Sequence, residues 1–143
     1  MSLIFIFIGG GTGALLRYLT SQFVNNLYNK NFSFGTIAVN CIGALLIGFL
    51  INIFDMFGIN TKWKLFLINI FDMFGINSKW KLFIITGFLG GYTTFSTYSL
   101  ETVNYFINGN VKYGILSILL NNVLCLLFVL LGLWVNRMIF NKY

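Results

Sequence analysis

The chain has 143 residues, of which 58% are hydrophobic and 8% are charged, and it contains no proline and no histidine. Soluble domains carry about 25% charged residues, so this composition excludes a soluble globular protein, and three acidic residues without histidine make an enzyme a weak hypothesis. The net charge of +6 comes from basic residues at the ends of apolar segments and in one loop, a distribution that indicates membrane topology and not nucleic-acid binding.

Apolar segments at about 3–24, 33–54, 82–107 and 113–135 are each long enough to cross a bilayer, which takes about 20 residues. We therefore predict an all-α membrane protein, a single domain of four transmembrane helices. Four helices of this length do not easily enclose a pore, so we expect an oligomer.

The first segment carries glycines in its first half. Gly9 and Gly13 lie four residues apart and form a small-residue face for close helix packing, and Arg17 continues that face by four more residues. Arg17 either extends to the lipid headgroups or places a positive charge at the mouth of a pathway for anions.

The second segment carries one stripe of polar and small residues, which recur every four positions: Thr36, Asn40, Ala44 and Gly48. This stripe either packs against another helix, with Asn40 as a hydrogen-bonding contact, or it brings the amide donor of Asn40 to an ion pathway.

Residues 51–67 and 68–84 are a near-identical tandem repeat that differs at two of seventeen positions. Asp, Lys and Asn residues interrupt the unit, so the extra copy cannot span the membrane. We expect it to enlarge the loop between the second and third segments, with its middle lying at the interface.

The third segment contains the most polar stretch of the membrane region, at 87–101. Gly90 and Gly91 lower helix propensity by about 1 kcal/mol each, and the hydroxyl groups of Thr93 and Thr94 can bond freed backbone groups. Irregular backbone survives in a bilayer only where protein or water satisfies it. We predict that this helix is broken near 90–94.

Beyond the break, Phe95, Tyr98 and Glu101 are spaced by three residues and share roughly one helix face. Ring edges are electropositive and can contact an anion, while a carboxylate inside a span costs about 2.5–3.5 kcal/mol. We predict an ion pathway on this face, with Thr94 and Ser99 as neighbouring hydroxyl groups. The alternative is a glycine-softened helix whose Ser and Thr bond their own carbonyl groups.

The fourth segment has a second polar stripe with a four-residue period, made by Tyr113, Ser117, Asn121 and Cys125. Helix packing is again the alternative to a pathway role. Cys41 and Cys125 both lie in mid-span, where a buried cysteine behaves as a small hydrophobic residue.

The run Gly-Phe-Leu-Gly-Gly-Tyr-Thr-Thr-Phe-Ser-Thr-Tyr-Ser-Leu-Glu at 87–101 resembles the signature of the CrcB family, the Fluc fluoride channels. The Gly35-Thr36 pair with Asn40 and Gly43 is similar to the same family. The resemblance implies a fluoride-selective channel in a bacterial or archaeal cell (inner) membrane that lets fluoride leave the cell passively. It further implies an antiparallel, dual-topology homodimer with two pores.

The resemblance also implies a structural sodium ion, Na+, held by main-chain carbonyl groups at the break. By motif position these belong to Gly90 and Thr93, and the two aromatic positions of the family fall on Phe95 and Tyr98. Tyr98 stands where phenylalanine is more usual, so its hydroxyl group could contact the ion instead. The remaining pathway positions are matched by Asn40, Glu101, Tyr113 and Ser117.

Two other classes of protein fit a small four-helix chain. A dual-topology drug/proton antiporter needs a carboxylate in its first helix, and residues 3–24 contain none. A non-transporting membrane assembly protein has no use for Glu101. Without the resemblance, the residues indicate only a pathway for a small ion.

The basic residues are divided unevenly between the two sides of a four-span chain. The side of the termini and second loop has six, Lys62, Lys64, Lys79, Lys81, Arg137 and Lys142, and the other side has three, Arg17, Lys30 and Lys112. Removing one repeat leaves four against three. Since orientation follows this bias, the duplication should favour one orientation, whereas an antiparallel dimer needs both.

Overall fold

The computed structural model describes residues 2–28, 31–55 and 78–140. Within these ranges the regular structure is entirely helical. The elements are α1 (Ser2–Leu27), α2 (Phe34–Asp55), α4 (Ser78–Lys81), η2 (Leu82–Leu89), α5 (Gly90–Tyr92), α6 (Phe95–Ile107), α7 (Val111–Leu119), η3 (Leu120–Leu124) and α8 (Cys125–Phe140), of which η2 and η3 are π-helical.

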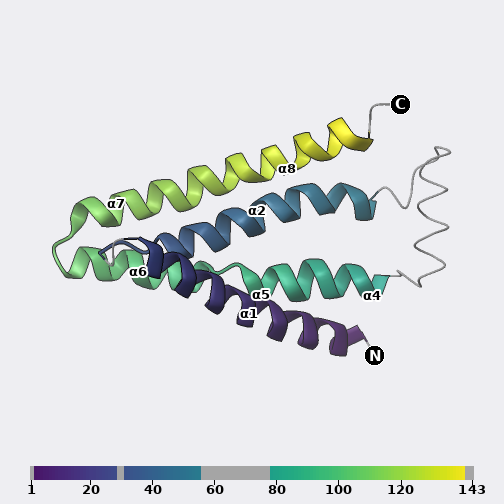
Figure 1. Cartoon of the computed structure of the whole chain (residues 1–143), viewed down its shortest axis with the longest axis horizontal. Coiled ribbons are helices and arrows are strands. Elements are labelled where there is room, and N and C mark those ends of the chain that lie inside the picture. Colours follow the sequence, from purple (N-terminus) through teal and green to yellow (C-terminus); the bar gives the residue numbers. More distant parts are fainter. Residues whose placement is uncertain (1, 29–30, 56–77, 141–143) are drawn as a thin grey trace.

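These elements form four long rods that run back and forth (Figure 1). α1 and α2 are the first two, α4 to α6 form the third, and α7 to α8 form the fourth. The start of α1, the end of α2, the start of α4 and the end of α8 lie at the same end of the molecule (Figure 1). Three stretches, Leu3–Leu27, Phe34–Ile51 and Val111–Phe140, are long and apolar enough to cross a membrane as unbroken helices. The predicted all-α membrane fold is confirmed.

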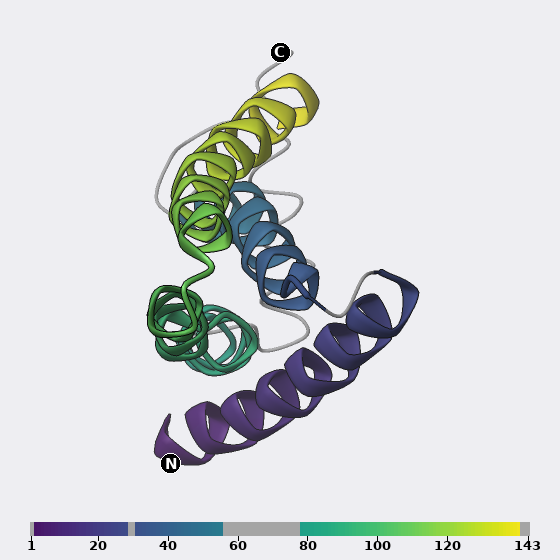
Figure 2. The same cartoon turned by 90° about the vertical axis from the view of Figure 1, so that its left-hand side faces the viewer.

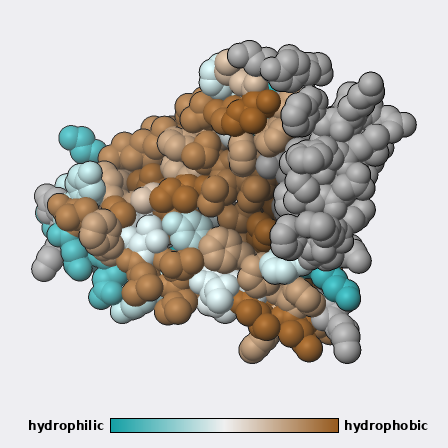
Figure 3. Space-filling model, turned by 45° about the vertical axis from the view of Figure 1, so that its right-hand side comes forward, coloured by the Kyte–Doolittle hydropathy of each residue, from teal (hydrophilic) through white to brown (hydrophobic). Residues whose placement is uncertain are grey.

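The described surface is largely apolar, as lipid requires. Phe7 is 82% exposed and Leu126 is 67% exposed, and brown hydrophobic side chains cover much of the face in Figure 3, with hydrophilic ones mainly near its ends. A soluble monomer rarely exposes a continuous apolar area of this kind.

Glycines set the contact between α1 and the third rod. A Cβ atom on Gly9 would lie 2.5 Å from the carbonyl oxygen of Phe83, and one on Gly91 would collide with the backbone of Gly10. The backbones therefore touch directly, which is the close packing that small residues permit in membranes. The predicted small-residue face of Gly9 and Gly13 is confirmed, since a Cβ atom on Gly13 would collide with the Phe88 carbonyl group.

The second and fourth rods pack side by side (Figure 2). Gly48 of α2 lies against the backbone of Val129, and Gly132 of α8 lies against Leu45 and Phe49. At this contact, Nδ2 of the buried Asn136 donates to the carbonyl oxygen of Phe49 at 2.8 Å.

The break in the third rod lies at two threonines. Gly90 remains helical, with φ −63° and ψ −36°, whereas Thr93 (φ −81°, ψ 158°) and Thr94 (φ −149°, ψ 117°) are extended. The break falls within the predicted range of 90–94, but the glycines serve a different purpose from the one predicted. They stay in the helix, and Gly91 gives α1 its close approach.

The two copies of the repeat contribute to different helices. Residues 51–55 form the end of α2, and residues 78–84 begin the third rod as α4 and the first turn of η2. The predicted enlarged loop falls mainly on residues 56–77, which lie outside the described residues.

Candidate functional site

The extended backbone at Thr94 is held by a side chain of the second rod. The Thr94 N–H group donates to Oδ1 of Asn40 at 2.8 Å, and Nδ2 of Asn40 donates to the Thr94 carbonyl oxygen at 3.1 Å. One amide side chain thus satisfies both backbone groups of Thr94 at the break, as a bilayer interior requires.

Both amide hydrogens of Asn40 are engaged, because Nδ2 also donates to Oδ1 of Asn121 at 3.0 Å. An asparagine has two amide hydrogens and no further donor. In this arrangement Asn40 is therefore a structural clamp, and it could donate to an ion only by exchanging one of these bonds.

The second half of the rod begins with a side-chain cap. The hydroxyl oxygen of Thr94 accepts from the Thr97 N–H group at 3.1 Å, the usual role of threonine at a helix N-terminus. In a continuous helix the Thr97 N–H group would donate to the Thr93 carbonyl group, and the Thr94 N–H group would donate to the Gly90 carbonyl group. Here they donate to the Thr94 hydroxyl group and to Asn40 instead. Those two carbonyl groups thereby lose their helical partners.

The two predicted polar stripes meet each other at Asn40 and Asn121, and a hydrogen-bond chain extends from there. Nδ2 of Asn121 donates to the Ser117 carbonyl oxygen at 3.2 Å. The hydroxyl groups of Ser117 and Thr102 lie 2.8 Å apart, and Thr102 donates to the Tyr98 carbonyl oxygen at 2.8 Å. Because Thr102 has one hydrogen, Ser117 is the donor in their contact. Both hydroxyl groups are buried, so this part of the stripe joins helices.

The aromatic pair stands at the start of α6. The rings of Phe95 and Tyr98 meet edge to face, with centroids 5.3 Å apart and planes at 70°. Phe95 is 76% exposed, whereas Tyr98 is 8% exposed. Nδ2 of Asn122 donates to the Tyr98 hydroxyl oxygen at 3.0 Å, and in the described part of the chain the hydroxyl hydrogen of Tyr98 meets no acceptor.

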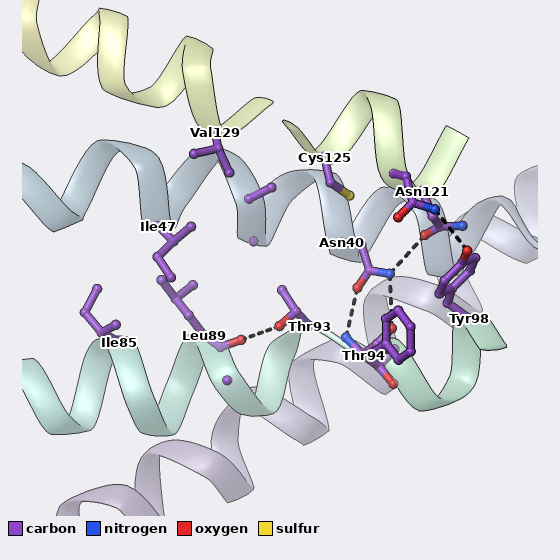
Figure 4. Close-up of a pocket in the computed structure, with 15 residues that line it drawn as sticks. Asn40, Ile47, Ile85, Leu89, Thr93, Thr94, Tyr98, Asn121, Cys125 and Val129 are labelled. Atoms are coloured by element: carbon purple, nitrogen blue, oxygen red, sulfur yellow. Dashed lines mark hydrogen bonds between the residues drawn. The ribbon is translucent and has the colours of Figure 1, made fainter. Parts of the chain in front are cut away.

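A pocket of about 380 Å³ opens beside this pair (Figure 4). Its walls come from the second rod, both sides of the break, and the fourth rod. The lining includes Asn40, Thr93, Thr94, Phe95, Tyr98, Asn121, Asn122 and Cys125, and none of the described residues that line it is charged. An ion here would meet neutral dipoles and ring edges only.

Glu101 lies in a second polar cluster, at the end of the molecule where α1 joins α2. Its Oε1 atom accepts from the hydroxyl groups of Ser33 at 2.7 Å and Thr36 at 2.9 Å. The Ser33 N–H group donates to the Tyr105 hydroxyl oxygen at 2.7 Å. The half-buried carboxylate thus has two donors, which lowers the cost of placing it in a membrane span.

The other predicted site residues are more dispersed. Tyr113 packs on Phe32, with ring centroids 5.6 Å apart, and it lies near the Glu101 cluster. Ser99 is half-buried on α6, and Arg17 is half-buried on α1, which contributes no residue to the lining of the pocket. The structure therefore brings Asn40, Thr94, Phe95 and Tyr98 together and leaves Arg17 apart.

Several contributors to these clusters were not predicted, among them Thr102, which bonds Ser117 and Tyr98. Asn122, Ser33 and Tyr105 each bond a predicted residue or its partner. Ser33 directly precedes α2, and a serine at a helix start was a readable signal. Asn122 lies in the π-helical turn η3 and directly follows Asn121, so the four-residue stripe does not include it.

Comparison with known proteins shows the family of the chain. A family model described as CrcB-like protein, Camphor Resistance (CrcB), matches residues 4–133. A protein named Fluoride-specific ion channel FluC from Clostridium perfringens is 42% identical over 134 residues, which cover 93% of this chain and 91% of that protein. Proteins with the same name from Campylobacter fetus and Haemophilus influenzae are 36% and 34% identical, over 97% and 99% of this chain and 96% and 78% of their own length. The chain is a multi-pass membrane protein that belongs to the CrcB-like family.

Proposed function

We propose that this protein is a fluoride-selective ion channel of the cell membrane that lets fluoride leave the cell passively. The observation that carries the proposal is the similarity, over nearly the whole chain, to proteins named Fluoride-specific ion channel. A channel conducts its ion without chemical conversion, which also accounts for a composition so poor in catalytic groups.

The local chemistry suits a small, strongly hydrated anion. Fluoride must exchange its water for other hydrogen-bond donors, and the free hydroxyl hydrogen of Tyr98 is one such donor beside the pocket. The exposed edge of Phe95 offers a weaker positive contact. No charged group lines the pocket among the described residues, so an anion would be held weakly enough to leave again.

A second copy of the chain in the opposite orientation would complete the pathway. Phe95 is 76% exposed and Gly90 is open on its outer side, where an added Cβ would meet nothing closer than 3.9 Å. An antiparallel homodimer would cover this face and bring two broken rods together. Its mass in detergent should be twice that of one chain.

The carbonyl groups of Gly90 and Thr93 fit a structural sodium ion. Their helical donors are directed elsewhere, to Asn40 and to the Thr94 hydroxyl group. Carbonyl oxygens suit hard cations. A sodium ion bound by two carbonyl oxygens from each of two chains would offset the cost of burying these unpaired dipoles. Sodium retained through gel filtration and measured by atomic emission would support this site, and full activity after dialysis into sodium-free buffer would contradict it.

A growth assay tests the proposed function in cells. Expression of the chain in a bacterium that lacks its own fluoride channel should restore growth in millimolar fluoride, and Phe95→Ile should not. An equal lack of rescue by both proteins, at equal amounts in the membrane, would contradict the proposal.

A further inference from the structure

The chain has two cysteines, and the fold brings them together. Cys41 lies on α2 and Cys125 begins α8. Both are free thiols, and Cys125 packs against the core cluster that contains Cys41. Two thiols on different helices thus meet at one buried cluster.

This thiol pair lies directly beside the polar link between the same two rods. Cys41 follows Asn40 in the chain, and Cys125 follows Asn121 by four residues, while Asn40 and Asn121 are bonded to each other. Cys125 lines the pocket, and Figure 4 shows its sulfur directed toward α2. Cys41 is not among the described residues that line the pocket, and it is 7% exposed. A small solute in the pocket would reach Cys125 first and then Cys41.

We propose that Cys41 and Cys125 form a binding site for a soft metal cation that accepts two ligands, such as Hg²⁺, Ag⁺ or Cu⁺. Thiolate sulfur selects soft ions. With Hg²⁺ the two S–H bonds break, two S–Hg bonds form, and two protons leave through the pocket, so charge balances without any change of oxidation state. Zinc is disfavoured, because it takes four ligands in structural sites and the described residues contain no group of three or more His, Cys, Asp or Glu.

The consequence for conduction rests on the proposed fluoride pathway. A metal bridge would hold α2 against α8 next to Asn40, whose amide keeps the break of the third rod open. Any shift of Asn40 during passage of an ion would be restrained. We expect bound metal to slow fluoride flux.

Hg²⁺ is the probe for the site, with the purified protein reduced and kept free of oxygen. After incubation with Hg²⁺ and an excess of a competing monothiol, gel filtration followed by metal analysis should find one mercury ion per chain. Cys41→Ser and Cys125→Ser each leave one thiol. A second ligand on the same protein typically raises binding by at least about 100-fold, so about 100-fold less competitor should be enough to remove mercury from either single variant. The double variant has no cysteine and is the blank.

The variants must elute like the original protein, and the fluoride flux of each is compared with its own flux before metal is added. Cys41→Ala replaces Cys41→Ser if the serine disturbs the apolar core. Equal retention by the single variants and the original protein would overturn the site. Mercury retained with unchanged fluoride flux would leave the site standing and overturn its effect on conduction. Absence of fluoride flux through the original protein without metal, by contrast, would contradict the proposed function and leave the metal site standing.

Discussion

The amide of Asn40 on α2 bonds both backbone groups of Thr94 on the third rod, accepting from its N–H group at 2.8 Å and donating to its carbonyl oxygen at 3.1 Å. A neighbouring residue of a β-strand would make a similar pair of bonds. The second rod therefore helps to maintain the break in the third through one side chain.

Asn40→Ala should destabilise the protein and abolish fluoride flux. Each backbone group of Thr94 left without a partner costs about 1–3 kcal/mol. Thermal unfolding in detergent and flux in liposomes measure the two effects. Asn136→Ala is the matched control, since it removes a buried amide that bonds the Phe49 carbonyl group between the second and fourth rods, away from the break. Asn136→Ala should lower stability and preserve flux. A loss of flux in both variants would mean that Asn40→Ala abolishes flux only by destabilising the protein.

Phe95→Ile should greatly reduce fluoride flux without lowering stability. The side chain is 76% exposed in one chain, and isoleucine keeps apolar bulk but lacks the positive ring edge. Phe23→Ile, at a residue that is 65% exposed on α1, should change neither quantity. Normal flux through Phe95→Ile would show that the ring only fills space.

Tyr98→Phe should retain most of the fluoride flux, and Tyr98→Ile should lose it. Phenylalanine keeps the edge-to-face contact with Phe95, and Asn122 keeps its 2.7 Å bond to the Ile118 carbonyl oxygen when the hydroxyl group is gone. The same liposome assay compares the two variants. If Tyr98→Phe is as inactive as Tyr98→Ile, the hydroxyl hydrogen is an essential donor to the ion.

The sequence allowed the four-helix fold and the break to be predicted, because hydropathy and the loss of helix propensity are local properties. The role of Gly91 was not predictable, since whether a glycine bends a helix or admits a neighbour depends on what packs against it. Asn40 was expected to be either a packing contact or a hydrogen-bond donor in the pathway. Its bonds to Thr94 and Asn121 within a single chain favour the packing role. The contact of Ser33 with Glu101 joins residues far apart in sequence, and no local pattern indicates it.

Deleting residues 51–67 should raise the share of chains that insert in the opposite orientation. The second copy repeats the same five residues at 68–72 that end α2 at 51–55, so the helix can form unchanged. The deletion removes Lys62 and Lys64 and changes the balance of basic residues from six against three to four against three. Reporter fusions at the C-terminus should label both sides of the membrane more evenly, and functional dimers should become more abundant. Equal two-sided labelling of the original chain would show that the added lysines do not decide orientation.

The most direct test of fluoride selectivity is efflux from liposomes that contain the purified protein and are loaded with equal concentrations of fluoride and chloride. Ion-selective electrodes follow both anions after valinomycin releases the counter-ion potassium. A pathway lined by neutral donors and ring edges that fits fluoride predicts rapid loss of fluoride, with chloride leaving no faster than from protein-free liposomes. Equal efflux of the two anions, or retention of both, would contradict it.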